Sequence, residues 1–181
     1  MKRFNFNGVC SKAVVLLVIM VFAAIGCSEN PLGADKKSEP QMLMRSAEAV
    51  SGISLSTAAH SIQQRISADK GGVLSLLDVT LEVPPGAVPN DTIFSINIPD
   101  VNVFYNEFGT SGLVFDVPVK VTMSYRNADL SGVDESTIRI GWLNPNTNEF
   151  IDVECEIDFR TQTVTGYLDH FSAYALISDE Q

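Results

Sequence analysis

The sequence predicts an all-β protein in which a single antiparallel β-sandwich follows a signal peptide and a flexible linker. Three observations favour this class. From residue 61 onward, apolar residues recur with the period of two that characterises half-buried strands. Proline and glycine interrupt this pattern every few residues, as they do in turns. Of the 181 residues, 45% are hydrophobic and 19% are charged, a composition that fits a folded core and argues against extensive disorder.

The first 26 residues have the features of a secretory signal peptide. Lys2, Arg3 and Lys12 precede an uncharged apolar run over residues 13–26. A membrane-spanning helix needs about 20 apolar residues, so this run is short for a permanent span. A cationic start, a short apolar middle and small residues at the end are typical of a leader that is removed on export.

The leader ends in Ala24-Ile25-Gly26-Cys27, which resembles the lipobox of bacterial lipoproteins, although that family prefers Leu where Ala24 stands. The resemblance implies cleavage between Gly26 and Cys27 and acylation of Cys27, with palmitate among the attached chains. Each buried CH₂ group contributes about 0.8 kcal/mol, so two or three chains hold a protein stably on a membrane. The alternative is an ordinary signal peptide in which Cys27 has no role.

The residue after the lipobox and the charge of the mature chain bear on localisation. Ser28 stands where an Asp, in lipoproteins of enteric-type bacteria, marks retention in the inner membrane, so the resemblance implies an outer-membrane protein of the bacterial cell envelope. Removal of residues 1–26 takes away three cations and leaves nine Lys and Arg against 22 Asp and Glu, a formal charge of −13. Because anionic membranes repel such a chain, the lipid on Cys27 must provide the membrane attachment. The same charge argues against nucleic acid as a partner.

The mature chain divides into a stalk and a domain. Residues 27–60 are expected to form the lipidated N-terminus and a flexible stalk, within which residues 41–50 are compatible with one short helix that begins near Ser38 or Glu39. The β-sandwich is expected over residues 61–178. Its strands are predicted at residues 61–68, 73–77, 79–83, 92–98, 115–125, 138–143, 151–159, 163–167 and 174–177.

The stretch 151–159 alternates most regularly and predicts one strand with a polar face. That face carries Asp152, Glu154, Glu156 and Asp158, which an extended strand places about 7 Å apart. We expect it to be a solvated surface; the alternative is that a basic partner or a cation uses it.

Several short motifs follow one another within the domain. They are Gly71-Gly72, residues 79–83 (VTLEV), Pro84-Pro85-Gly86-Ala87-Val88, Asp91-Thr92-Ile93, residues 111–115 (SGLVF), residues 118–121 (PVKV), Trp142 and residues 170–176 (HFSAYAL). In this order they resemble the ZU-five domain, a module named after zonula occludens and uncoordinated-five proteins. The resemblance covers residues 71–177 and implies an antiparallel β-sandwich that works as a binding module, without a cofactor. The expected partner is a protein or a glycan.

The tripeptide His170-Phe171-Ser172 is the one candidate for catalysis. Some ZU-five domains cleave themselves within this tripeptide, so the resemblance implies that the Ser172 hydroxyl attacks the Phe171 carbonyl with His170 as general base, and that water hydrolyses the resulting ester. A cut there releases only residues 172–181, whereas self-cleaving relatives release a whole domain. We therefore expect the tripeptide to be a packing feature and the protein to be no enzyme.

Other residues give weaker signals. Two histidines and one remaining cysteine do not make a usual zinc site, and no nucleotide-binding or hydrolase motif occurs. The turns 129–135 and 144–149 offer oxygen ligands to Ca²⁺ but lack the EF-hand spacing, so we expect solvated turns. Cys155 is expected to be a buried strand residue.

The stretch around Phe104, Tyr105 and Phe108 is predicted to be a loop. It either folds over the core or presents aromatic rings to a glycan, in which case the domain is a carbohydrate-binding or surface-adhesion module. His60 is expected to be a linker or strand-edge residue.

The lipid anchor gives a first testable expectation. Replacing Cys27 with Ser should move the protein from the membrane fraction to the soluble fraction, because serine is not a substrate for lipid attachment. Cell fractionation and labelling with radioactive palmitate measure both properties, and Cys155→Ser is the matched control. Wild-type protein that incorporates no palmitate, or a Cys27→Ser variant that stays in the membrane, contradicts the anchor.

Overall fold

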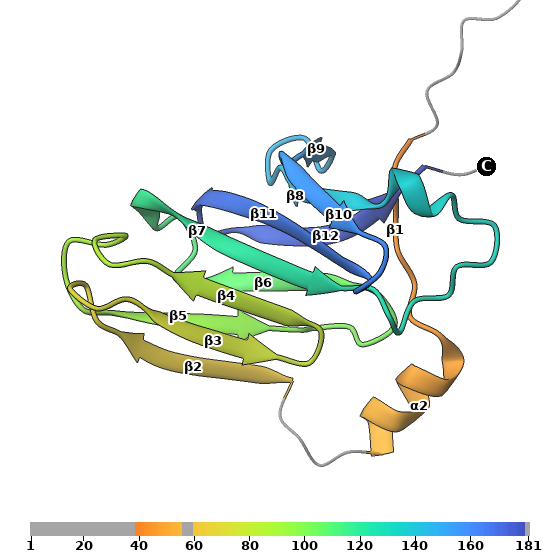
Figure 1. Cartoon of the computed structure of the whole chain (residues 1–181), viewed down its shortest axis with the longest axis horizontal. Helices are drawn as coiled ribbons and strands as arrows, with labels where there is room; N and C mark the ends of the chain where they lie inside the picture. The colour runs from red at the N-terminus through yellow and green to blue at the C-terminus, as the bar shows by residue number, and fades with distance from the viewer. Residues whose placement is uncertain (1–38, 56–59, 180–181) are drawn as a thin grey trace, which may run out of the picture. The chain divides into compact units, whose positions relative to one another are not determined.

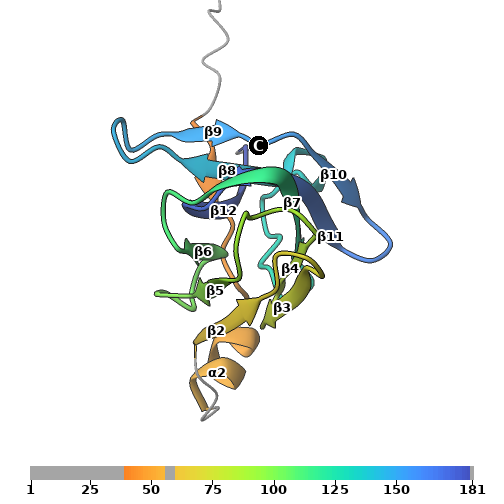
Figure 2. The ribbon, with the colours of Figure 1, turned by 90° about the vertical axis from the view of Figure 1, so that its left-hand side faces the viewer.

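The computed structural model describes residues 39–55 and 60–179, and these residues form two antiparallel β-sheets packed against each other (Figure 1 and Figure 2). The first sheet contains, in spatial order, β2 (Ser61–Ile66), β5 (Thr92–Asn97), β6 (Tyr105–Gly109), β12 (Ala173–Ser178), β8 (Arg139–Leu143) and β9 (Phe150–Asp152), and β1 (Gln41–Met42) also pairs with β12. The second sheet contains β10 (Cys155–Asp158), β11 (Thr163–His170), β7 (Val114–Ser124), β4 (Val79–Val83) and β3 (Gly72–Leu76). The predicted all-β sandwich is confirmed.

Alternation of apolar and polar residues turns one side of each strand toward the core, as β4 shows. Its residues Val79, Leu81 and Val83 are buried, whereas the two residues between them lie on the outer side. The strand ends at Pro84-Pro85, because proline has no N–H to give to a ladder. Gly86 follows with a φ of +77°, a left-handed conformation that glycine adopts without strain. The proline–glycine motif is therefore a structural corner.

Phe171 lies in the core and joins the two sheets. Its ring is fully buried, and its centroid lies 4.9 Å from that of Phe94 in β5, 5.8 Å from that of Phe108 in β6 and 4.8 Å from that of Phe115 in β7. Because β5 and β6 belong to the first sheet and β7 to the second, this one side chain contacts both layers. The pairs with Phe94 and Phe115 are edge-to-face, at 80° and 87°, a geometry that the charge distribution of aromatic rings favours.

The domain begins earlier in the chain than residue 61. β1 pairs with the C-terminal end of β12, and Leu43, which follows it, is buried and exchanges backbone hydrogen bonds with Leu176 and Phe104. The expectation of a flexible stalk is therefore wrong for residues 41–46, which are paired with or hydrogen-bonded to the sandwich. The rest of the expected stalk, together with Gly26 and Cys27, lies outside the described residues, apart from residues 39, 40, 47–55 and 60.

The short helix expected in this segment is present but starts later than predicted. It is α2 (Ala47–Leu55), and the Ser46 hydroxyl caps it by accepting a hydrogen bond from the Ala49 N–H at 3.3 Å. The start expected near Ser38 or Glu39 is wrong, because the chain first forms β1. Of the helices in the described ranges, none is both long and apolar enough to cross a membrane.

Arg45 holds the N-terminal segment on the sandwich. Only 4% of this residue is exposed. Its guanidinium donates to the Asp78 carboxylate in the β3–β4 turn at 2.9 Å and to the carbonyl oxygens of Val101, at 3.2 Å, and Val103. It also lies 4.2 Å from the ring centroid of Phe104. One buried cation thus connects the segment before α2 with two loops that are distant in the sequence.

The strand predicted over 151–159 is two strands in different sheets. β9 pairs with β8 in the first sheet, whereas β10 pairs with β11 in the second. The chain crosses between the sheets at Val153, whose N–H donates to the Ile140 carbonyl at 2.9 Å. Ile151 and Phe159, which the alternation places inside, are 45% and 53% exposed. The prediction of one strand is wrong because a period of two also fits an extended chain that changes its partner sheet.

The remaining predicted strands agree with the structure to within two residues at each end, except that β11 continues three residues further, to His170. β6 occupies the stretch that was expected to be a loop.

Arg45→Ala should lower the free energy of unfolding by about 3 kcal/mol. It removes the cation paired with the mostly buried Asp78 carboxylate, which keeps only its hydrogen bond from Asn127 Nδ2, and it leaves two carbonyl groups without this donor. Urea denaturation followed by Trp142 fluorescence measures the loss. Arg65→Ala is the matched control, since Arg65 is exposed and its hydrogen bond to the Asp91 carbonyl is 3.4 Å long; we expect it to lose less than about 0.5 kcal/mol. Equal stability of the two variants contradicts the role of Arg45.

Candidate functional site

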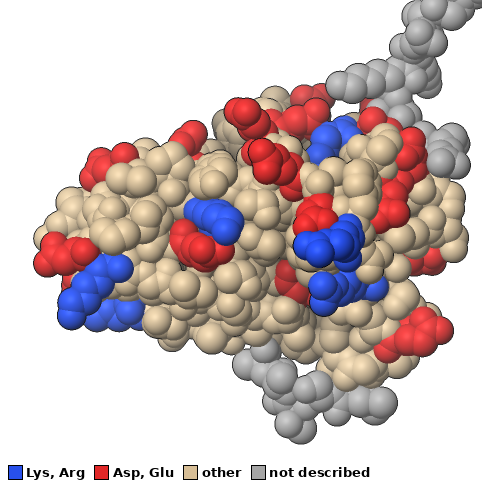
Figure 3. All heavy atoms as spheres, viewed as in Figure 1, with Lys and Arg blue, Asp and Glu red and all other residues tan. Residues whose placement is uncertain are grey.

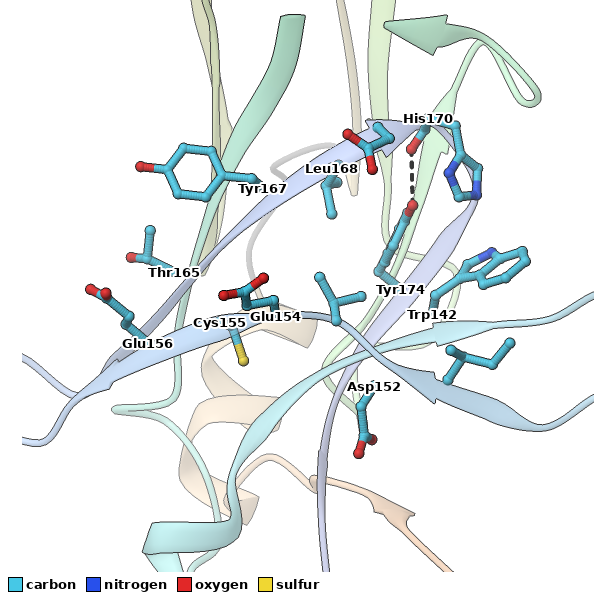
Figure 4. Close-up of a pocket in the computed structure, with 13 residues that line it drawn as sticks. Trp142, Asp152, Glu154, Cys155, Glu156, Thr165, Tyr167, Leu168, His170 and Tyr174 are labelled. Atoms are coloured by element: carbon cyan, nitrogen blue, oxygen red, sulfur yellow. Dashed lines mark hydrogen bonds between the residues drawn. The ribbon is translucent and has the colours of Figure 1, made fainter.

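The tripeptide His170-Phe171-Ser172 ends β11 and leads into β12. Its backbone takes part in four hydrogen bonds. The Phe171 N–H donates to Leu113 O (2.8 Å), the Gly112 N–H to Phe171 O (2.9 Å), the Phe108 N–H to Ser172 O (3.0 Å) and the Tyr174 hydroxyl to His170 O (2.9 Å; Figure 4). These bonds and the buried Phe171 ring fix the position of the turn between the last two strands.

Only one element of a self-cleavage site is assembled at this turn. The Gly112 N–H points at the carbonyl oxygen that would become an oxyanion if Ser172 attacked Phe171. In contrast, the His170 imidazole and the Ser172 hydroxyl, both within the described part of the chain, share no hydrogen bond. The imidazole packs edge-to-face against Trp142, with 5.0 Å between ring centroids. Packing therefore accounts for the aromatic members of the tripeptide.

The backbone conformation gives no sign of strain at the tripeptide. Among the described residues other than glycine, positive φ angles occur at Leu77, Asn148 and Gln162, all of which lie in turns. A left-handed strained residue, which would raise the energy of the ground state, is thus absent from the described tripeptide.

A pocket of about 580 Å³ opens beside this turn, where the chain leading into β10 diverges from β11 (Figure 4). Its carboxylates are Asp152, Glu154, Glu156 and Asp169, and its aromatic side chains are Trp142, Tyr167, His170 and Tyr174. In Figure 4, Trp142 and His170 lie together at one end of the opening, whereas Tyr167 points away from it. The aromatic rings therefore do not enclose the opening as a cage would.

The carboxylates of this pocket differ in their partners. Asp152 is paired with the Nε atom of Arg139 at 2.7 Å, and Arg139 is also paired with Asp179 at 2.9 Å. Glu154, Glu156 and Asp169 have no ion pair in the structure as far as it is described. The predicted acidic strand face is thus exposed beside a pocket, and it is divided between two sheets because the chain crosses from one to the other at Val153 and Glu154. We call the unpaired carboxylates of Glu154, Glu156 and Asp169 the acidic rim.

Cys155 lines the same pocket without being poised as a nucleophile. Its side chain is half-buried, and this burial raises the pKa of the thiol, so the neutral form prevails at neutral pH. The Ile140 N–H also donates to its sulfur at 3.5 Å. Both observations fit the expected inert strand cysteine.

The turn 129–135 uses its carboxylates to stabilise itself. Asp129 accepts a hydrogen bond from the Ser131 N–H at 3.0 Å, and Asp134 accepts one from the Ser136 N–H at 2.9 Å. Hydrogen bonds from the serine side chains and then from their N–H groups lower the pKa of both carboxyl groups. Across residues 39–55 and 60–179, no group of three or more His, Cys, Asp or Glu side chains is arranged to hold a metal ion.

Two of the three aromatic residues proposed as a glycan platform are part of the core. Phe104 is 1% exposed and Phe108 is 2% exposed, whereas Tyr105 is half-buried. The alternative in which these rings line an open groove is therefore wrong for Phe104 and Phe108, which lie in the core as the other alternative expected. The physical reason is that β6 pairs with β5 and β12, which turns these two rings into the space between the sheets. His60 lies just before β2, and its carbonyl accepts a hydrogen bond from the Ile98 N–H at 2.8 Å.

The sequence did not single out an exposed apolar surface on the second sheet. A hollow of about 630 Å³ lies on its outer face, over β3, β4 and β7, with Tyr167 of β11 at one side. Val73, Val117 and Tyr167 line it and are 56%, 40% and 62% exposed. The alternation in 163–167 already places Tyr167 on the same side as two threonines. Which side faces water, however, depends on the partner strands.

Comparisons with known proteins were made for the whole chain. A scan against protein-family models found no match, and a search of curated protein sequences found none either. The ZU-five assignment therefore stays a prediction from the order of its motifs.

The geometry of the tripeptide predicts that the purified chain stays intact. Mass spectrometry under denaturing conditions, after long incubation at neutral pH, should find no detached fragment 172–181, because no base is hydrogen-bonded to the Ser172 hydroxyl. Ser172→Ala should give the same masses, whereas Phe171→Ala should lower the free energy of unfolding by about 3–5 kcal/mol. Release of 172–181 from the wild type but not from Ser172→Ala contradicts the packing role.

Proposed function

We propose that this chain is a lipid-anchored protein of the bacterial cell envelope, held on the outer membrane through Cys27. Its sandwich is a non-catalytic, ZU-five-like module that binds a protein or glycan partner. The leader and the lipobox-like Ala24-Ile25-Gly26-Cys27 support the anchor. The order of motifs from Gly71 to residue 177, on a two-sheet antiparallel sandwich, supports the module.

The N-terminal boundary of the domain limits how far the module reaches from the membrane. Because Gln41 is already paired in β1, only 14 residue steps separate it from Cys27. A chain of this length spans at most about 50 Å when fully extended. The module therefore works close to the membrane surface, and its partner is a component of the same envelope layer.

The observation that carries the binding role is the outer face of the second sheet. Large exposed apolar side chains gather there, namely Val73, Val117 and Tyr167, in a protein whose mature formal charge is −13. Soluble proteins rarely leave such side chains together at a surface hollow unless a partner covers them. The acidic rim of Glu154, Glu156 and Asp169 adjoins this face and disfavours acidic partners.

Self-cleavage between Phe171 and Ser172 is the second candidate function. The single observation in its favour is the Gly112 N–H, which donates to the Phe171 carbonyl oxygen at 2.9 Å and is suitably placed to stabilise an oxyanion. The mass measurement described above decides between this reaction and the packing role.

A photoreactive side chain placed at the proposed face tests the binding role. Full-length, lipidated protein with a diazirine amino acid at Val117 should cross-link to one envelope component in living cells, because Val117 lines the hollow. The same probe at Ile93, which is 46% exposed on the other sheet, is the matched control. Equal cross-linking at both positions, or none at Val117, contradicts a binding surface on the second sheet.

A further inference from the structure

We propose that the outer face of the second sheet binds an uncharged glycan. The inference rests on the proposed function in that it uses the same face, and it adds the chemical class of the ligand. We call this surface the hydroxyl face, and it consists of Val73, Ser75, Thr80, Glu82, Val117, Lys120, Thr122, Thr165 and Tyr167. A row of hydroxyl groups, an exposed aromatic ring and the absence of net charge together argue for that class.

The hydroxyl groups form one row that crosses four strands. Ser75 of β3 is the register partner of Thr80 in β4, Thr80 is the partner of Thr122 in β7, and Thr122 is the partner of Thr165 in β11. Register partners in an antiparallel sheet point to the same side, and neighbouring strands lie about 4.8 Å apart. The row therefore presents a hydroxyl group at regular intervals across the face.

These hydroxyl groups keep capacity for a ligand. They are joined in two pairs, Ser75 with Thr80 at 2.9 Å and Thr122 with Thr165 at 3.3 Å. Each hydroxyl has one donor site and two acceptor sites, so a pair that shares one hydrogen bond still offers a donor and several acceptors. Sugar hydroxyls, which are both donors and acceptors, match such a row without any charged group.

A second row beside the first contains an aromatic ring, an aliphatic side chain and the ion pair of the face. The register places Val73, Glu82, Lys120 and Tyr167 across the same four strands, and Tyr167 is 62% exposed. The hollow of about 630 Å³ runs along this row. A pyranose ring has C–H bonds on its faces and hydroxyl groups at its edges, so it can pack on the Tyr167 ring while its edges reach the hydroxyl row.

The charge of the face selects against other occupants. Its two charged residues are paired, since Lys120 Nζ lies 2.8 Å from Glu82 Oε1, and Lys70 is a further cation that lines the hollow. Figure 3, which views this side of the molecule, shows one adjacent pair of a basic and an acidic group within a mostly uncharged area, with further charged groups around it. A polyanion is repelled by a chain of charge −13, a polycation is drawn instead to the acidic rim, and a second copy meets the same negative charge. A neutral polymer is neither repelled by the negative charge of the chain nor attracted to the acidic rim.

Native affinity electrophoresis tests the proposal with the full mature chain carrying Cys27→Ser, which stays soluble without altering the face. Gels contain one of xylan, mannan, mixed-linkage β-glucan, dextran or soluble chitin oligomers, and dextran sulfate serves as the charged polymer. We expect at least one neutral glycan, and not dextran sulfate, to retard the protein. Tyr167→Ala should weaken that binding by about tenfold or more, because it removes the exposed aromatic ring of the site.

Three further variants separate binding from folding. Thr122→Val with Thr165→Val keeps the shape of the side chains but removes one hydroxyl pair, and we expect severalfold weaker binding. Ile93→Ala removes an apolar side chain that is 46% exposed on the other sheet and should leave binding unchanged. Thermal unfolding of every variant verifies that the sandwich is intact. Tyr167→Phe keeps the ring, and it should retain most of the affinity.

The outcomes distinguish this inference from the proposed function. If no neutral glycan retards the protein, or if Tyr167→Ala binds as well as the wild type, the glycan proposal is overturned. If Val117 then cross-links to a protein in cells, the face still has a binding role, but its ligand is a protein and not a glycan. A concentration-dependent dimer in sedimentation velocity that Tyr167→Ala abolishes would identify a second copy as the occupant and would also overturn it.

Discussion

The burial of Phe171 is the constraint on which the rest of the structure depends. Its ring contacts aromatic rings from both sheets, so the spacing of the two layers and the position of the β11–β12 turn are set together. The strand that follows this turn, β12, lies between β6 and β8 in the first sheet, although it is the last strand in the sequence. The burial of Phe171 also determines the chemistry of the tripeptide. A turn held by a core side chain and by several backbone hydrogen bonds has little freedom to bring His170 and Ser172 into a reactive arrangement.

Arg45 complements this core at the other end of the domain. A buried guanidinium that is shared between Asp78 and two carbonyl groups makes residues 41–45 part of the sandwich rather than of the tether. The first described residues therefore pair with the last strand, in the first sheet, and both described ends of the domain lie close together (Figure 1). The hydroxyl face belongs to the other sheet. Under the proposed function, the tether leaves from one layer and the ligand binds at the other.

Much of the fold was predictable because strand periodicity is a local property. β4, β5 and β7 were expected within one residue of their actual ends, since each is bounded by turn residues and buries alternate side chains. Two expectations failed for a non-local reason. The stretch 151–159 keeps its alternation while it changes sheets at Val153, and residues 41–45 are held by partners that lie far away in the sequence. The site was less predictable still. From the sequence alone, Phe104 and Phe108 resemble exposed loop residues, and only the pairing of β6 shows that they are buried. Tyr167 likewise resembles any other strand residue until its neighbouring strands are known.

The sequence by itself determined the fold class, the corner at Pro84-Pro85-Gly86 and the negative charge of the chain, because these follow from residue types and short-range spacing. Only the tertiary structure decided which side of each strand faces water. A period of two distinguishes two faces without saying which one is covered, and that choice depends on the partner strands. For the same reason, the row of Ser75, Thr80, Thr122 and Thr165 exists only in the folded sheet, where register aligns four residues that are scattered over 90 positions of the chain.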